Sequence, residues 1–135
     1  MKPDPEPRLR QINDDHDAVL ELCDQVLSAA ARAEPALGEA QDAALRLLER
    51  ASEHVGAEQE LMHALAYPSR EAHAADHDRL LERLSALVSL SAGPGGRRLT
   101  TATLEFREAM QQHISTWDWN LADFVRRAET GGGPP

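Results

Sequence analysis

The 135-residue sequence has little of several residue types, and each shortage narrows the choice of structure. A single cysteine, Cys23, excludes a disulfide within the chain and fits a reducing compartment. Aromatic residues make up only 4% of the chain, so leucine, alanine and valine must form most of the core, which suits helices. No segment approaches the roughly 18 apolar residues of a membrane span, and the N-terminus has no apolar signal core. We therefore expect a cytoplasmic protein without a membrane partner.

Positive charge is also scarce. Fourteen Lys and Arg residues against 23 Asp and Glu residues give a formal net charge of -9. Such a surface repels phosphate backbones, so we expect no nucleic-acid partner, and it also keeps a small protein soluble. The length and the 41% share of hydrophobic residues fit one globular domain.

Apolar residues recur at steps of three and four in four segments, as on one face of a helix. The first segment begins near Arg8 and ends at Ala33-Glu34-Pro35, where Pro35 can open the second helix. Ser69 is a plausible N-cap for the third segment, and the Gly- and Pro-rich loop 92–96 precedes the fourth. The predicted inward positions are Leu9, Ile12, His16, Val19, Cys23, Val26 and Ala30, then Ala44, Leu47, Ala51, His54, Glu58, Leu61 and Leu65, then His73, His77, Leu80, Leu84, Leu87 and Ser91, and finally Leu99, Thr103, Phe106, Met110, His113, Trp117, Leu121 and Phe124.

Four helices with three short connections predict an all-α protein, an antiparallel up-down-up-down four-helix bundle. We place the bundle at residues 9–128. A proline-rich N-terminal arm of residues 1–8 precedes it, and a flexible glycine- and proline-rich tail of residues 129–135 follows it.

Histidines are concentrated on the inward faces. A lone core histidine is usually a hydrogen-bonded packing residue, but five in the cores of four helices would each need a buried partner. A shared metal ion would meet that need for all of them. The five are His16, His54, His73, His77 and His113, whereas the sixth, His63, falls off its stripe.

Two pairs of residues stand four positions apart and are therefore neighbours on a helix surface. His54 pairs with Glu58, and His73 pairs with His77. Between the pairs lies Tyr67-Pro68, where proline should turn the chain back. The two pairs would then face each other across a helical hairpin and could aim their donor atoms at one point.

Asp118 follows His113 by five positions, which is an awkward spacing. On an ideal α-helix the two side chains would point roughly 140° apart, and Trp117 is better aligned. Either Asp118 is an ordinary solvated acid, which the spacing alone favours, or the helix contains a π-bulge there. Trp117 would be a core residue or would line the site.

The number of candidate ligands is consistent with two metal ions. If two octahedral ions share Glu58 and Asp118 as bridges, five imidazoles and one bridging solvent oxygen bring the total to eleven of twelve positions. The remaining position is open to a small ligand. Imidazole with carboxylate suits iron, whereas structural zinc prefers closed four-coordinate sites, often with thiolates.

In order, spacing and distribution over four helices, these residues resemble the complete ligand signature of the hemerythrin family. The resemblance covers about residues 9 to 128 and extends to neighbours of the candidate ligands. Its elements are His16, His54-x-x-x-Glu58, His73-x-x-x-His77 and His113-x-x-x-x-Asp118, with Leu61-Met62, Tyr67-Pro68 and His113-Ile114 beside them.

The resemblance implies a non-haem di-iron centre with an oxo or hydroxo bridge, and it implies that Asp118 is a ligand. Dioxygen would bind reversibly at the open position of the two-histidine iron, for storage, delivery or sensing. The 135 residues contain no output domain, so if they are the full-length chain, a sensing role would need an unidentified protein partner. The implied ligands are His73, His77 and His113 on one iron, His16 and His54 on the other, and Glu58 and Asp118 on both.

Three departures from the family pattern surround these ligands. Val55 stands where an aromatic residue is common, Ala109 and Met110 replace tryptophan and leucine, and the longer tryptophan-containing N-terminal arm is absent. We therefore expect a roomier or wetter pocket, which protects bound dioxygen less well. That hypothesis predicts faster autoxidation, or a di-iron enzyme acting on peroxide or nitric oxide. A third interpretation is an interaction module that holds another metal or none.

Overall fold

The computed structural model of the chain describes residues 6–32, 38–93 and 96–129. All secondary-structure elements in the described part of the chain are helices, as predicted. They are α1 (Glu6–Ala30), α2 (Glu39–Ala64), α3 (Arg70–Ser91), α4 (Gly96–His113), the π-helix η1 (Ile114–Asp118) and α5 (Trp119–Glu129).

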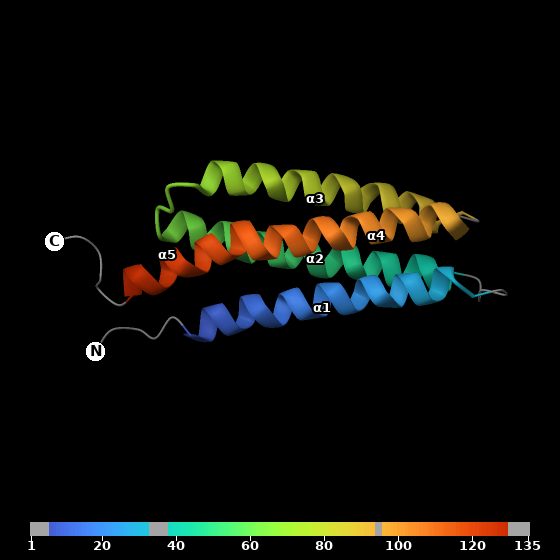
Figure 1. The fold of residues 1–135 in the computed structure, drawn as a ribbon, viewed down its shortest axis with the longest axis horizontal. Coiled ribbons are helices and arrows are strands. Elements are labelled where there is room, and N and C mark those ends of the chain that lie inside the picture. Colours follow the sequence, from blue (N-terminus) through green and yellow to red (C-terminus); the bar gives the residue numbers. More distant parts are fainter. Residues whose placement is uncertain (1–5, 33–37, 94–95, 130–135) are drawn as a thin grey trace.

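The helices form an all-α four-helix bundle. Figure 1 shows α1 and α3 running in one direction and α2 and α4 in the other, with η1 and α5 continuing α4 as the fourth rod. Each rod packs against two neighbours, because α1 contacts both α2 and α4, and α3 contacts the same two helices. No described helix is sufficiently long and apolar to span a bilayer.

Most helix boundaries lie within a few residues of the predicted ones, and α2 begins at Glu39, four residues after Pro35. Helix α1 begins at Glu6 rather than near Arg8. Ser69 occupies the predicted N-cap position of α3, but its side chain makes no capping hydrogen bond. The proposed role of Pro35 lies outside the described residues, as do positions 1–5 of the arm and 130–135 of the tail.

Two apolar clusters fill the bundle. The larger includes Val19, Leu47, Leu84 and Phe106, and the smaller is made of Ile12, Leu61, Met62, Tyr67, Leu121 and Val125. Full burial of one such side chain stabilises the fold by about 1.5–3 kcal/mol. Along α1, α2 and the fourth rod, the buried histidines and acids lie between residues of the two clusters, so apolar packing encloses them at both ends.

Candidate metal centre

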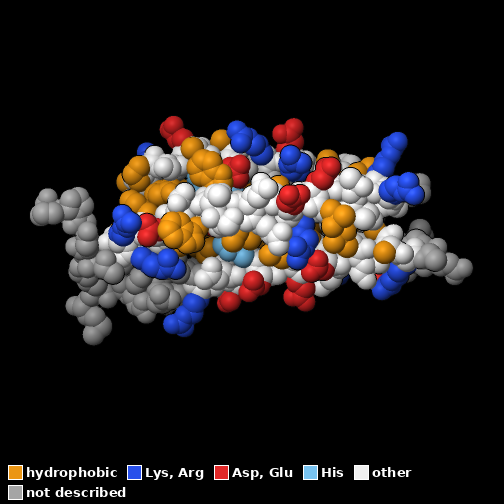
Figure 2. Space-filling view, in the orientation of Figure 1, with side chains coloured by type: hydrophobic (Ala, Val, Ile, Leu, Met, Phe, Trp, Pro, Cys, Tyr) orange, Lys and Arg blue, Asp and Glu red, His pale blue; other side chains and the backbone are white. Residues whose placement is uncertain are grey.

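The structure brings all seven sequence-predicted site residues together in the interior. Their side chains come from four rods: His16 from α1, the α2 pair, the α3 pair, and His113 with Asp118 from the fourth rod. His16 is the most exposed of them at 6%, and Glu58, His73 and His77 are at 0%. Only a small area of histidine is visible on the face drawn in Figure 2. The predicted exception, His63, is exposed.

The π-helix explains how Asp118 reaches this site. Residues 114–118 adopt π geometry, and the backbone N–H of Trp119 bonds the carbonyl of Ile114, five positions earlier. Because a π-turn bonds residues five apart, it brings Asp118 to the face that holds His113. Asp118 is 3% exposed, while Trp117 is only partly buried, with its ring centroid 5.9 Å from that of His73. The bulged alternative is therefore the one found, and Trp117 borders the site.

Donor atoms form two groups that can each hold a cation. Within each group, one ligand atom per residue lies within 4.8 Å of all the others. The two carboxylates belong to both groups. The first group is Glu58, His73, His77, His113 and Asp118, and the second is His16, His54, Glu58 and Asp118.

Separations between donor atoms fit ligands that share an ion. His77 Nε2 lies 2.8 Å from Glu58 Oε1, and Nε2 atoms of His73 and His113 are 3.2 Å apart. His113 Nε2 is 2.9 Å from Asp118 Oδ1. Nitrogen ligands lie about 2.0–2.1 Å from a first-row ion, which places two ligands at right angles about 3 Å apart.

Several buried donor atoms have no hydrogen-bond partner in the described part of the chain. They include both oxygens of Asp118, Oε2 of Glu58 and both ring nitrogens of His54. His16 Nε2 lies only 2.6 Å from Asp118 Oδ2, as two ligands of one ion do, yet neither atom has a hydrogen bond. Unpaired buried polar atoms are costly, and these converge as metal ligands do. The residues present therefore fit a pair of cations.

In the metal-free protein, the protonation of each histidine in this cluster depends on its burial and on the neighbouring carboxylates. Burial by itself lowers the pKa of His54 and of His113, but the close carboxylates of Asp118 and Glu58 outweigh it and raise each pKa to about 10. The pKa of His73 is raised for the same reasons, whereas burial prevails and lowers the pKa of His77. The metal-free site is therefore partly protonated at neutral pH.

The two acids stay ionised despite their burial. Burial by itself raises the pKa of Glu58 and of Asp118, but the surrounding imidazoles, His113 foremost, hold both pKa values far below their usual range. Bridging carboxylates must be deprotonated to bind cations. These two meet that condition at any ordinary pH.

A second layer of polar residues contacts the candidate ligands, and sequence reasoning missed it. Asp15 Oδ2 lies 3.5 Å from His54 Nδ1, and Asp15 also accepts hydrogen bonds from Arg50 and Gln11. Gln59 lies against Nδ1 of His77, and Asp76 lies against Nδ1 of His113. These Nδ1 atoms are the outer ring nitrogens, since Nε2 of each ring faces the donor cluster. Each of these three residues, Asp15, Gln59 and Asp76, is next to a candidate ligand in the sequence. Polar residues that face solvent are equally common at such positions, so the sequence contains no signal that distinguishes them.

The cavity beside the histidines is small and apolar. It measures about 10 Å³, roughly the space that one water-sized molecule needs. Three ligand rings border it, and the rest of its lining is apolar, with Val55, Phe106 and Met110 among the residues. We expected a roomier or wetter pocket from Val55, Ala109 and Met110. The structure instead has a small apolar cavity at this position, because Phe106 and Met110 are buried and fill the space.

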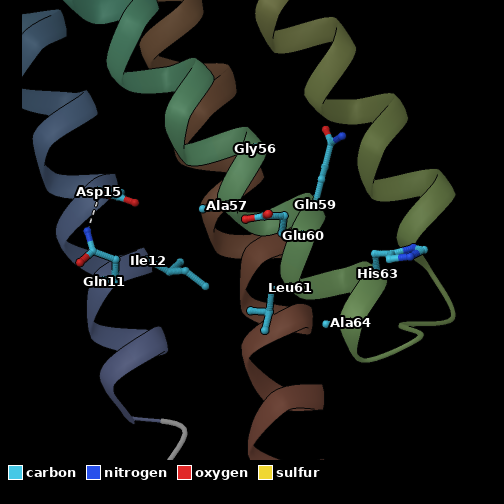
Figure 3. Close-up of a pocket in the computed structure, with 10 residues that line it drawn as sticks. All are labelled: Gln11, Ile12, Asp15, Gly56, Ala57, Gln59, Glu60, Leu61, His63 and Ala64. Atoms are coloured by element: carbon cyan, nitrogen blue, oxygen red, sulfur yellow. Dashed lines mark hydrogen bonds between the residues drawn. The ribbon is translucent and has the colours of Figure 1, made fainter.

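A wider cleft of about 960 Å³ lies along α1 and α2 and includes none of the seven residues (Figure 3). Gln11 donates to Asp15 on the α1 side, while Gln59 and His63 point away from α1. Two of its lining residues contact candidate ligands: Asp15 lies 3.5 Å from His54, and Gln59 lies 3.3 Å from His77.

Fold and site together define a class: a four-helix bundle with a buried histidine and carboxylate cluster suited to metal cations. The family model described as hemerythrin HHE cation binding domain matches residues 8–125. The chain therefore belongs to the hemerythrin family, as the sequence resemblance indicated. Neither the curated proteins nor the solved structures gave a match.

Proposed function

We propose that this protein holds two iron ions and binds dioxygen reversibly, for storage, delivery or sensing. The observation that carries the proposal is the composition of the two donor groups. One group contains three histidines and the other two, and Glu58 and Asp118 belong to both. That division supports one ion on each group with two bridging carboxylates, and it leaves the two-histidine ion with the fewer protein ligands.

The chemistry of the donors favours iron. Five imidazoles and two carboxylates suit iron and similar first-row ions, and the lone Cys23 belongs to the apolar core rather than to the site. When bound, a pair of ferrous ions supplies two electrons and an open position for a small ligand. The chain itself holds the two acids ionised. Contacts with Asp15, Gln59 and Asp76 orient three of the imidazoles.

The surroundings of the site support a small, weakly polar ligand. The adjoining cavity has space for about one such molecule, and Val55, Phe106 and Met110 help to exclude water from it. Exclusion of water limits proton leakage to a bound ligand. Dioxygen fits these conditions better than a larger organic substrate does.

The proposal is tested by loading the protein with ferrous iron without air and recording its visible spectrum. We expect a charge-transfer band that appears when oxygen is admitted and disappears when oxygen is removed. A direct and irreversible passage to the diferric spectrum would contradict reversible binding. Turnover with peroxide or nitric oxide and a reductant would then favour the alternative, a di-iron enzyme.

A further inference from the structure

The outer ring nitrogens of the three-histidine group have unequal partners. His113 Nδ1 lies 2.6 Å from Asp76 Oδ2, and His77 Nδ1 lies 3.3 Å from Gln59 Oε1. His73 Nδ1 is buried and has no hydrogen-bond partner among the described residues. His113 alone in this group therefore has a short contact from its outer nitrogen to a carboxylate.

Asp76 reaches His113 from another helix. It lies on α3, one position before His77, and its side chain crosses to the fourth rod. Oδ1 lies 3.7 Å from Arg79 Nη1, which leaves Oδ2 for His113. The carboxylate accepts, so the ring must donate its Nδ1–H.

Asp76 also lies at the border between the buried site and solvent. A groove of about 400 Å³ runs between α3 and the fourth rod, lined by Asp76, Arg79, Arg83 and Trp117 among others, and it reaches His113. The Asp76 side chain is 19% exposed, whereas that of His113 is 0% exposed. Partial hydration and the nearby arginine make an ionised carboxylate less costly here than in the core.

We propose that Asp76 is a positioning residue of the metal centre, which fixes the tautomer of His113 and strengthens it as a ligand. In the neutral ring that binds a metal ion, Asp76 holds the proton on Nδ1, so the Nε2 atom, 2.9 Å from Asp118 Oδ1, carries the lone pair that faces the donor cluster. A carboxylate behind a ligand imidazole orients the ring and raises its basicity. This inference rests on the proposed di-iron function.

The experiment compares ferrous iron affinity in the wild type with three variants, Asp76→Ala, Asp76→Asn and Asp78→Asn. Asp78 is the matched control, because it flanks His77 on the other side and carries the same charge but is exposed. By competition with a chelator, we expect Asp76→Ala to weaken one of the two iron sites about 10- to 100-fold. Asp76→Asn should weaken it less, since an amide oxygen can still accept the Nδ1–H, and Asp78→Asn should leave both affinities unchanged.

The midpoint potential of the iron pair is a second readout, which would not change if Asp76 had only a structural role. Loss of the negative charge disfavours ferric iron, so Asp76→Asn should raise the potential while Asp78→Asn does not. Because Asp76→Asn keeps the size of the side chain, it decides the matter even if Asp76→Ala fails to fold. An unchanged affinity and potential in Asp76→Asn would overturn the role of Asp76. A wild-type protein that takes up no iron pair would overturn the di-iron proposal instead.

Discussion

Glu58 is fully buried, and the ring nitrogens of four histidines lie within 3.8 Å of its Oε1 atom. A carboxylate in such a place is very costly unless it is paired or bound to a cation. The neighbouring imidazoles stabilise its charge in the metal-free protein, and metal ions would replace their protons.

Histidines 54 and 63 form a matched pair on α2, since one is 1% exposed within the cluster and the other is exposed outside it. We expect His54→Ala to reduce the bound iron from two ions per chain to at most one, because the second donor group loses one of its two imidazoles. His63→Ala should keep both ions. Iron analysis of purified, reconstituted variants makes the comparison, and equal losses in the two variants would refute the assignment.

Loading the metal-free protein should release protons. The pKa of His54 and the pKa of His113 are each about 10, above pH 7, so both rings are protonated there, yet a ring must be neutral to bind an ion. At pH 7 we expect at least two protons to be released per chain, and the number should fall as the pH rises through about 10. Calorimetry in buffers with different ionisation enthalpies measures it. Uptake of metal without release of protons would contradict the charge state described for the empty cluster.

The thiol of Cys23 should be inert in the folded protein. It is 0% exposed, and burial raises its pKa from 9.0 to about 12, which lowers the thiolate fraction at pH 8 about a thousand-fold. We expect no measurable labelling by a maleimide in native buffer and complete labelling in denaturant, followed by mass spectrometry. Rapid labelling of the native protein would show that this part of the core opens readily.

At the scale of elements, η1 is the feature on which the site depends most. Five-residue spacing does not fit an α-helix, so the spacing alone favours a solvated acid, and only the resemblance to the hemerythrin family indicates that Asp118 is a ligand. The π-helix also shifts the inward face beyond it. Leu121 and Val125 are buried there, while Phe124, predicted to face inward, is only partly buried and packs edge-on against Tyr67.

Moving the acid by one position tests the π-register. In an Asp118→Asn background, Trp117→Asp places a carboxylate where an ordinary α-helix would aim it at the site. We expect metal content to stay as low in the double variant as in Asp118→Asn alone, because in the π-helix position 117 borders the site rather than facing the bridging position. Recovery of metal in the double variant would mean that the helix is α-helical there.

The α-helices and six of the seven candidate ligands could be predicted because both depend on periodicity, whereas Asp118 was predicted only from the resemblance to the hemerythrin family. Residues at steps of three and four must share a helix face, whatever surrounds them. The contacts of Asp15, Gln59 and Asp76 could not be predicted in this way. Each touches a ring on a different helix, so its role depends on how the helices pack, and its polar character suits solvent equally well. The filling of the pocket by Phe106 and Met110 is likewise a matter of packing between helices.

At the scale of the whole molecule, the bundle is an apolar scaffold around a polar layer. Along α1, α2 and the fourth rod, the two apolar clusters lie on either side of the buried histidines and acids and hold the helices in place. Such enclosure lowers the effective dielectric constant and strengthens every interaction among the buried charges. It also makes an unsatisfied charge costly, so metal binding and stability of the bundle should be coupled.

The most direct test of this account is an anaerobic titration of the metal-free protein with ferrous iron, in which the bound iron per chain is counted. We predict saturation at two ions per chain, because Glu58 and Asp118 belong to both donor groups. Saturation at one ion, or no binding at all, would contradict the claim that these seven side chains form a centre for a pair of metal ions.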